Sequence, residues 1–243
     1  MKILILGGTA EARELANRLV DRGHDVTSSL VGRTSDPRLP KGGIRMGKFG
    51  GIPGLAAYMR AVGTQRLVDA THPYAGLMSV NAVAAAQATG IGLVRFMRQA
   101  WTQTPGDDWL TLDTTAEAAA ALPANADVLL TSGHTGLEAF FERDDCQFVA
   151  RLIEPPVAEL PRHISVLLSR PPYDLTGEIQ LMEREEITHL VTKNSGGGQT
   201  AAKLAAARRL GVKVIMIARP AYGPAVEVSD LDGAMAAVET GAG

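Results

Sequence analysis

The fold of this chain is decided by one stretch near its N-terminus, which reads KILILGGTAEAR from Lys2 to Arg13. The apolar run Lys2–Leu6 ends at two glycines, which is typical of a strand buried on both faces of a parallel sheet. Apolar residues then recur at helical spacing over Ala10–Arg22, and Gly23 supplies a helix stop. The stretch therefore predicts a strand, a glycine turn and a helix, the first unit of an α/β sheet.

The same alternation continues along the chain. Further β-rich runs at Asp25–Val31, Arg66–Ala70 and Leu93–Phe96 alternate with helical patterns, and the second half repeats this style. We expect two Rossmann-like open, mainly parallel sheets with helices on both faces. Residues 1–100 are predicted as the first domain and residues 101–243 as the second. In such sheets ligands bind beyond the carboxyl ends of the strands, so we expect the active site in the cleft between the two domains.

Composition removes several classes of protein. The chain has 243 residues, of which 46% are hydrophobic and 21% charged, with a net charge of −2. These values exclude a disordered or collagen-like chain and a basic nucleic-acid binder. Cys146 is the only cysteine, so no intrachain disulfide or multi-cysteine metal site is expected. With no apolar run of membrane-spanning length and too short a run for a signal peptide, the sequence indicates a cytoplasmic protein that binds neither membrane nor nucleic acid.

The opening turn is a candidate nucleotide site. Gly7, Gly8 and Thr9 follow a strand and precede a helix, where backbone N–H groups and the helix dipole attract a pyrophosphate. The pattern lacks the third glycine of a full dinucleotide fingerprint, and an ordinary tight turn is the competing interpretation.

The end of the second strand indicates which dinucleotide would bind. NAD sites usually place an acid there for the ribose hydroxyl, but this chain has Arg33, Thr34 and Ser35 instead. A guanidinium and two hydroxyls suit a 2′-phosphate, so we predict NADPH rather than NADH. The alternative for Arg33 is a solvated loop arginine.

A third cluster, DATHPYA at Asp69–Ala75, lies at another predicted strand end. Thr71 is assigned to the cofactor, and His72 and Tyr74 are candidate proton donors or ligands for a polar substrate group. A histidine in such a loop is also often only a hydrogen-bonding residue. Since no other His or Cys lies at ligand spacing nearby, we predict no metal site.

Two loops of the second half suggest anion binding. A predicted strand is followed by Ser132, Gly133 and His134, and a longer loop with three consecutive glycines begins at Lys193. Three consecutive glycines lose more conformational entropy on folding than the single glycine of an ordinary turn. The additional glycines indicate backbone N–H groups exposed to an anion. The competing interpretations are a simple glycine turn and a flexible linker. The candidate substrate ligands of the longer loop are Lys193, Asn194, Ser195, Gly196 and Gly197, joined by Arg219 further along.

Four motifs together resemble the precorrin-6A reductase family of cobalamin biosynthesis. They are the opening stretch Ile5–Arg13, the segment Asp69–Ala75, the loop Thr192–Gly197 and the segment Ala218–Pro220, which occur in the family's order over nearly the whole chain. The resemblance implies an NADPH-dependent enzyme that reduces the precorrin-6A macrocycle to precorrin-6B between two Rossmann-like halves. It also implies that the opening glycines hold the pyrophosphate and that the other loops line the cleft.

This interpretation agrees with the residues, because a tetrapyrrole fringed with carboxylates suits glycine-rich helix starts and cationic side chains. Its partner would be that small molecule, with hand-over to neighbouring pathway enzymes. Two alternatives remain open at this point. One is a methyltransferase that uses S-adenosylmethionine, although such enzymes usually place an acid where Arg33 stands. The other is a binding protein that senses NADP without catalysis, which would have no need for the triple-glycine loop.

Overall fold

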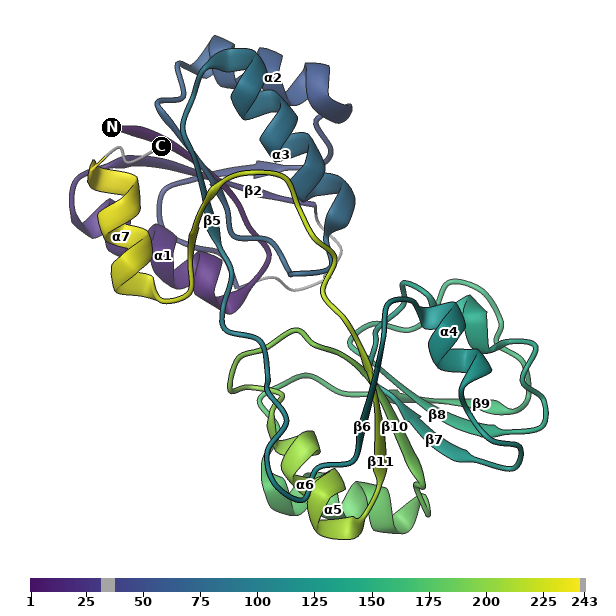
Figure 1. Ribbon diagram of the computed structural model, residues 1–243. Coiled ribbons are helices and arrows are strands. Elements are labelled where there is room, and N and C mark those ends of the chain that lie inside the picture. Colours follow the sequence, from purple (N-terminus) through teal and green to yellow (C-terminus); the bar gives the residue numbers. More distant parts are fainter. Residues whose placement is uncertain (32–37, 241–243) are drawn as a thin grey trace. The chain divides into compact units, whose positions relative to one another are not determined.

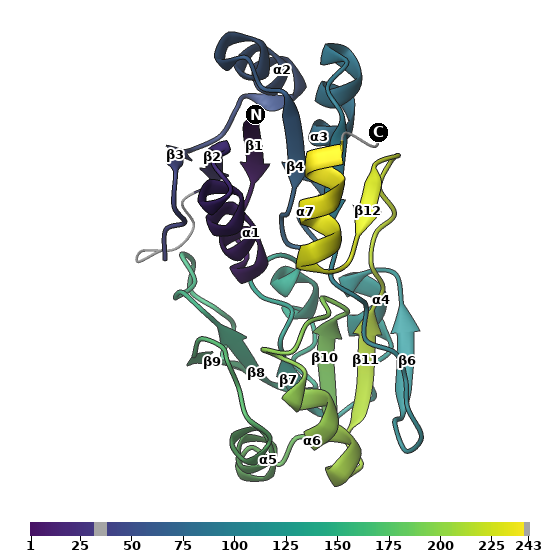
Figure 2. The same cartoon turned by 90° about the vertical axis from the view of Figure 1, so that its left-hand side faces the viewer.

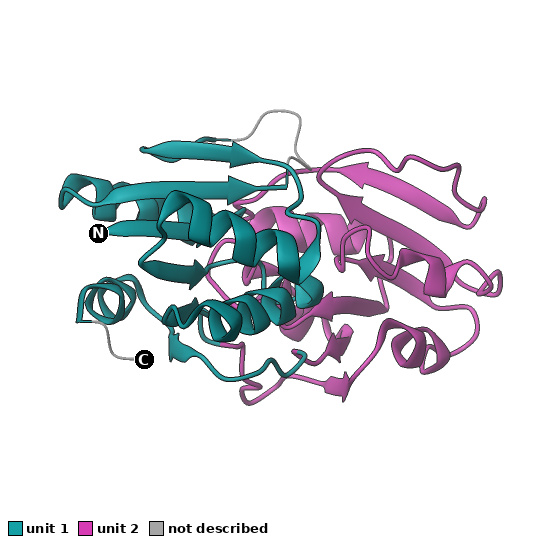
Figure 3. Ribbon diagram, turned by 90° about the horizontal axis from the view of Figure 1, so that it is seen from above, with its two compact units in different colours: residues 1–99, 220–243 teal, residues 100–219 magenta. Residues whose placement is uncertain are grey.

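The computed structural model describes residues 1–31 and 38–240, and the chain divides into two compact units (Figure 3). Unit 1 contains residues 1–99 and 220–243, and unit 2 contains residues 100–219. The predicted division therefore needs a correction, because residues 220–243 belong to the first unit and not to a second domain of residues 101–243. Each unit is built on one six-stranded sheet in which every neighbouring pair of strands is parallel, as an α/β Rossmann-like fold requires.

The sheet of unit 1 has the strand order β12-β5-β4-β1-β2-β3. Its strands are β1 (Lys2–Leu6), β2 (Asp25–Leu30), β3 (Gly43–Met46), β4 (Arg66–Asp69), β5 (Leu93–Phe96) and β12 (Val226–Val228). The first strand lies in the middle of the order, and its four residues after Lys2 are all buried. An apolar run without alternation is therefore explained by helices on both faces.

Four helices cover this sheet, two on each face (Figure 1). They are α1 (Ala10–Asp21), α2 (Gly51–Val62), α3 (Gly76–Thr89) and α7 (Leu231–Thr240). Ile3 and Ile5 belong to the core formed with α1 and α7, whereas Leu4 and Leu6 belong to the core formed with α2 and α3. Successive side chains of a strand point to opposite faces, so one strand anchors both halves of the core.

The sheet of unit 2 has the order β6-β11-β10-β7-β8-β9. Its strands are β6 (Trp109–Leu112), β7 (Asp127–Leu130), β8 (Gln147–Leu152), β9 (Ile164–Leu168), β10 (His189–Lys193) and β11 (Lys213–Ile217). The accompanying helices are α4 (Thr115–Ala120), the short 3₁₀ helix η1 (Leu137–Phe140), α5 (Leu175–Arg184) and α6 (Ala202–Leu210). Side chains of α5 and α6 share one core cluster with the central strands, among them Leu181, Leu204 and Leu190.

The chain crosses between the units twice, and one edge strand of each sheet follows a crossing. Strand β6 comes after β5 in sequence but pairs with β11, and β12 comes after β11 but pairs with β5. The last helix, α7, then packs beside α1, as Figure 2 shows. The sequence did not predict β6 or β12, because both are short edge strands without a fully buried residue and their partners are far away in sequence.

The predicted ligand-binding loops lie at the carboxyl ends of strands. The turn Gly7–Thr9 follows β1, and the segment Ala70–Ala75 follows β4, the neighbour of β1. In unit 2 the segment 131–136 follows β7, and the segment 194–201 follows β10, the neighbour of β7. In each unit two glycine-containing or polar loops thus lie together at the carboxyl edge of a parallel sheet. In the described part of the chain, no helix combines the length and apolar character that crossing a bilayer requires.

The return of the C-terminal segment to unit 1 leads to a stability prediction. Met235 of α7 is 5% exposed within the core shared with α1, whereas Leu77 on α3 is 79% exposed. We expect Met235→Ala to lower the free energy of unfolding by about 2–4 kcal/mol, since it leaves a cavity, and Leu77→Ala to change it by less than about 0.5 kcal/mol. Urea denaturation of both variants measures the difference, and equal effects would contradict this account of α7.

Candidate functional site

The opening turn of unit 1 is fixed on both sides and leaves an open surface at Gly8. The amide of Gly7 donates to the carbonyl of Ser29 at the end of β2 (3.0 Å). Thr9 caps α1, because its hydroxyl accepts from the amide of Ala12 (3.0 Å) and donates to the carbonyl of Ala70 (3.1 Å). Gly8 has φ +116°, and a Cβ added there would meet no atom within 4 Å. The turn is therefore rigid, and its glycine lets a ligand approach the backbone at the start of the helix.

The loop after β4 is held by a buried carboxylate. Asp69 is 2% exposed, and its Oδ1 accepts hydrogen bonds from the hydroxyl (2.7 Å) and the amide (3.2 Å) of Thr71. The amide of Tyr74 donates to Nδ1 of His72 (3.3 Å), and the centroids of these two rings lie 5.8 Å apart. The two side chains that the sequence predicts as candidate proton donors therefore lie next to each other. His72 is exposed.

A small hollow is lined by side chains of both this loop and the start of α1. Arg98 forms an ion pair with Glu11 of α1 (Nη1 to Oε1, 2.9 Å), and the other oxygen of Glu11 is buried with no hydrogen-bond partner among the described residues. The hollow has a volume of about 10 Å³, room for about one water molecule. It is lined by Thr9, Glu11, Thr71, Pro73, Phe96 and Arg98.

Sequence reasoning missed Glu11 and Arg98 as site residues. An acid in the first turn of a helix is ordinary because it complements the helix dipole, so the residue type gave no functional signal. Arg98 lies just after β5 at the same edge of the sheet as Gly7–Thr9, a placement that only the strand order reveals.

In unit 2, Lys193 joins the two candidate loops. Its ammonium group donates to the backbone carbonyls of Ser132 (2.7 Å) and Thr135 (3.0 Å). Burial lowers the pKa of Lys193, and the carboxylate of Glu138 opposes that shift. Since the lysine lies at the end of β10 and its partners follow β7, one side chain holds both loops in place at the edge of the sheet.

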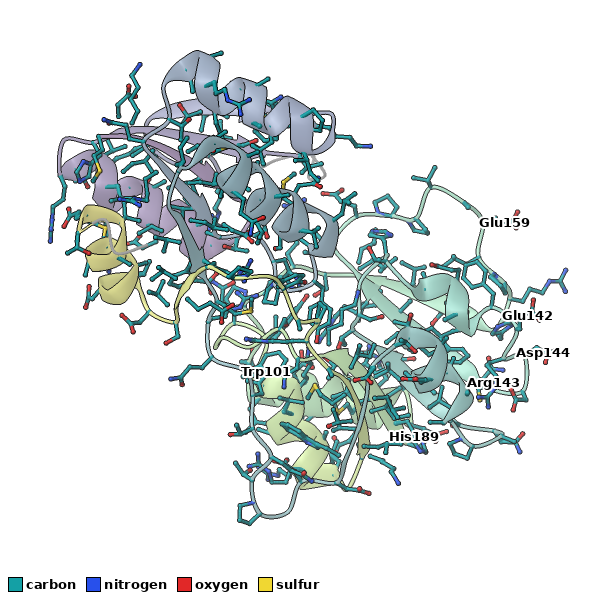
Figure 4. All side chains as sticks on the ribbon, turned by 45° about the horizontal axis from the view of Figure 1, so that its top comes forward. Trp101, Glu142, Arg143, Asp144, Glu159 and His189 are labelled. Atoms are coloured by element: carbon teal, nitrogen blue, oxygen red, sulfur yellow. The ribbon has the colours of Figure 1, made fainter. Side chains whose placement is uncertain are left out.

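Trp101 and Arg219 fix the loop that follows Lys193. The amide of Trp101 donates to Oδ1 of Asn194 (2.8 Å), and Nδ2 of Asn194 donates back to the carbonyl of Trp101 (2.9 Å). The indole N–H donates to the carbonyl of Gly197 (3.0 Å), and Nε of Arg219 donates to the carbonyl of Asn194 (2.6 Å). Trp101, labelled in Figure 4, is a further residue that the sequence did not point out, because it lies in a segment without periodicity.

The remaining predicted residues of unit 2 differ in their exposure. Gly133, Gly196 and Gly197 all have positive φ, and a Cβ at Gly133 would meet no atom within 4 Å. Ser132 and Ser195 are buried, and the hydroxyl of Ser132 has no hydrogen-bond partner among the described residues. His134 is exposed, and its backbone carbonyl accepts a hydrogen bond from the amide of Leu137. The backbone at Gly133 is therefore open, whereas Gly196 and the two serines are buried.

A buried group of charges supports the glycine loop of unit 2. Lys203, in the first turn of α6, is 3% exposed, and its ammonium lies 5.1 Å from the ring centroid of Trp101. Arg151 forms a buried ion pair with Glu178, and its guanidinium lies 4.0 Å from the ring centroid of Tyr173. Burial lowers the pKa of Lys203 to about 7; the charge of Arg151 lowers it as well, and that of Glu178 raises it.

The sequence contained a weak signal for Lys203. It lies on the same helical face as Ala206, Ala207 and Leu210, at spacings of three, four and seven residues. A lysine on an apolar face of a predicted helix is unusual, because burying an ammonium group is costly.

The sequence also predicts a 2′-phosphate site and no metal site. Arg33, Thr34 and Ser35, predicted to bind the 2′-phosphate, lie outside the described residues. Within residues 1–31 and 38–240, no group of three or more His, Cys, Asp or Glu side chains is arranged to hold a metal ion.

Comparisons with known proteins agree with one another. The model of the family described as precorrin-6x reductase CbiJ/CobK matches residues 2–239. A precorrin-6A reductase of Rhodococcus erythropolis is 48% identical, with 98% of each chain covered, and one of Rhodobacter capsulatus is 42% identical, with 96% of this chain and 94% of the relative covered. A cobalt-precorrin-6A reductase of Priestia megaterium is 31% identical over 90% of each chain. Among solved structures, one described as CobK precorrin-6A reductase superposes with a TM-score of 0.93 at 38% identity, covering 100% of this chain and 97% of that one.

The buried lysine predicts how stability depends on pH. Because the pKa of Lys203 falls from 10.5 to about 7 on folding, the unfolded chain binds more protons than the folded one between these values, and stability rises with pH there. We expect the wild-type protein to gain about 1 kcal/mol of unfolding free energy per pH unit, relative to Lys203→Met, between about pH 7 and about pH 9.

Urea denaturation of both proteins across this range measures that gain. The exposed Lys213, replaced in the same way, is the control. Lys193, whose pKa burial also lowers, is present in all three proteins, so its contribution cancels in the comparison. Parallel pH profiles for wild type and Lys203→Met would contradict the assignment.

Proposed function

The chain belongs to the precorrin-6x reductase family, and from this premise we propose that it reduces the macrocycle of precorrin-6A to that of precorrin-6B in cobalamin biosynthesis, with NADPH as the hydride donor. The observation that carries the proposal is the family match over almost the whole chain, together with relatives that bear the name of this reaction. A cytoplasmic location fits the proposal, because a lone buried cysteine such as Cys146 is ordinary in a reducing compartment.

The residues of unit 1 fit a dinucleotide. Gly8 provides open backbone next to the start of α1, where Thr9 caps the amide of Ala12 and the amides of Ala10 and Glu11 precede the first bond within the helix. A side chain at Gly8 would occupy this open space and would be strained at its positive φ. We therefore assign the pyrophosphate to Gly7, Gly8 and Thr9, and we assign the nicotinamide side to Thr71, whose hydroxyl is fixed by Asp69.

The choice of NADPH over NADH rests on residues at the end of β2. The strand ends at Leu30, and no acid follows at the position where NAD enzymes place one. Arg33 offers a fork of donors for a phosphate, and Thr34 and Ser35 offer hydroxyls. We propose that these three side chains bind the 2′-phosphate.

We assign the tetrapyrrole to the loops of unit 2. Open backbone at Gly133 and the positive-φ turn at Gly196 and Gly197, together with the cations Lys193 and Arg219, suit the carboxylates that fringe a precorrin. Ser132, His134, Asn194 and Ser195 complete the proposed set. The relatives at 48% and 42% identity are named for the metal-free substrate, and a relative at 31% for the cobalt-containing one, so we propose metal-free precorrin-6A as the substrate.

In the proposed mechanism NADPH, when bound, supplies a hydride to an electrophilic carbon of the macrocycle. The chain holds the two partners in reacting geometry and excludes water, which contributes several kcal/mol to lowering the barrier. The conjugated neighbour of the reduced carbon then needs a proton, so that one hydride and one proton are added in total. We propose that His72 or Tyr74 holds this proton, with solvent as the alternative source.

The decisive test is direct. Purified protein is mixed with precorrin-6A and NADPH, and the tetrapyrrole is followed by its absorption spectrum and its mass. The proposal expects oxidation of one NADPH per macrocycle and a product heavier by two hydrogen atoms. A macrocycle that returns unchanged, or one that gains a methyl group in a parallel reaction supplied with S-adenosylmethionine, would reject the proposal.

The proposed 2′-phosphate site predicts cofactor selectivity. Arg33→Ala is expected to raise the Kd for NADPH by about 10- to 100-fold, the cost of losing a hydrogen bond to a charged group, and to leave the Kd for NADH nearly unchanged. Arg38→Ala, a neighbouring exposed arginine of the same loop, is the matched control. Quenching of protein fluorescence measures both constants, and an equal loss for both cofactors would contradict the assignment of Arg33.

The proton donor is tested by two replacements in the loop after β4. If His72 is the general acid, His72→Asn should slow the reduction by about 10²-fold or more while the Kd for NADPH stays the same. Tyr74→Phe gives the corresponding test for the phenol. Single-turnover rates with saturating cofactor are the measurement, and near-wild-type rates in both variants would assign the proton to solvent.

A further inference from the structure

A buried arginine lies beneath the loop that carries His72 and Tyr74. Arg95 of β5 is 1% exposed, and its Nε lies 3.5 Å from Oδ2 of Asp69 at the end of β4. Its Nη1 donates to the carbonyl of Gly223 (2.9 Å) and to Oε1 of Glu227 (2.9 Å). One guanidinium therefore joins the carboxylate at the base of the loop to the segment that returns from unit 2.

The same returning segment reaches the middle of the loop directly. The hydroxyl of Tyr222 donates to the carbonyl of Pro73 (2.5 Å), and the Tyr222 ring lies with its centroid 5.2 Å from Cζ of Arg95. Burial and the charge of Asp69 raise the pKa of Tyr222, so its hydroxyl keeps the proton that it donates. A Cβ added to Gly76, the first residue of α3, would lie 3.8 Å from this phenol, so the ring also lies against the start of that helix.

The loop is thus held at two points. On one side Arg95 faces Asp69, which accepts both hydrogen bonds from Thr71. On the other side Tyr222 holds the carbonyl of Pro73, the residue between His72 and Tyr74. Pro73 has no N–H group and a fixed φ, so a bond to its carbonyl restrains the orientation of the neighbouring residues.

From these contacts we propose that Tyr222 and Arg95 are positioning residues for the reduction. The segment that returns to unit 1 after residue 219 fixes the loop Thr71–Tyr74, and with it the side chains that face the reacting atoms. This inference rests on the proposed function of that loop and extends it to residues that touch neither substrate nor cofactor. A misplaced donor group is costly, because proton transfer requires contact at hydrogen-bond distance.

The test uses Tyr222→Phe, which removes one hydroxyl and keeps the ring. Replacing Arg95 is less informative, because it leaves the buried Asp69 without its counter-ion and is expected to unfold unit 1. The matched control is Tyr58→Phe in the same unit, whose ring packs edge-on against Phe49 with centroids 5.3 Å apart.

We expect Tyr222→Phe to lower the single-turnover rate of precorrin-6A reduction by about tenfold, the loss equivalent to one hydrogen bond. The Kd for NADPH and the KM for precorrin-6A should stay within about twofold of wild type, since the lost interaction contacts neither ligand. Tyr58→Phe should match the wild type in all three quantities. A lower melting temperature with an unchanged rate per folded molecule would show a purely structural role and overturn the proposal.

A second measurement is independent of the reaction. Hydrogen exchange followed by mass spectrometry should show faster exchange of the amides of residues 71–79 in Tyr222→Phe than in Tyr58→Phe. Unchanged exchange would show that the hydroxyl does not hold the loop, whatever the activity. If the wild type fails to reduce precorrin-6A, the proposed function falls, whereas the exchange experiment still decides whether Tyr222 restrains this loop.

Discussion

Both sheets depend on how the polar backbone groups just beyond the end of each parallel strand are satisfied. The amide of Gly7 donates to the carbonyl of Ser29, and the amide of Ala70 donates to that of Leu6, so each loop begins with one more bond of the sheet ladder. Unit 2 repeats the device, since the amide of Thr131 donates to the carbonyl of Val191 and the amide of Asn194 to that of Ile217. The loops therefore leave the sheets in fixed directions.

The two units support their loops in different ways. In unit 1 the support comes from the carboxylate of Asp69, which holds Thr71 and faces the buried Arg95, and from the hydroxyl of Thr9, which caps α1. In unit 2 it comes from the ammonium of Lys193 and the indole of Trp101, above the buried charges of Lys203, Arg151 and Glu178. A site for a carboxylate-rich ligand is better served by the second kind of support, because its cations raise the local positive potential.

Much of this arrangement followed from the sequence, and the reasons are specific. The run Lys2–Leu6 predicted a central strand because it lacks alternation, and the glycine loops marked the strand ends. The membership of residues 220–243 in unit 1 did not follow, because Val226–Val228 is short and pairs with a strand more than a hundred residues earlier. Arg95 and Trp101 were missed for a related reason: their roles arise from partners that only the folded chain brings near. The sequence identified loops that can bind ligands, but not the residues that hold them still.

The double crossing of the chain bears on how the protein is made. Strand β12 and helix α7 complete the first sheet and one of its two cores, yet they follow all of unit 2 in the sequence and leave the ribosome after it. The first hundred residues therefore emerge without an edge strand and without one covering helix, leaving apolar surface and unpaired backbone groups exposed until β12 and α7 are made. A gene divided after residue 99 would therefore not encode two self-sufficient halves, because the first half would lack this strand and this helix.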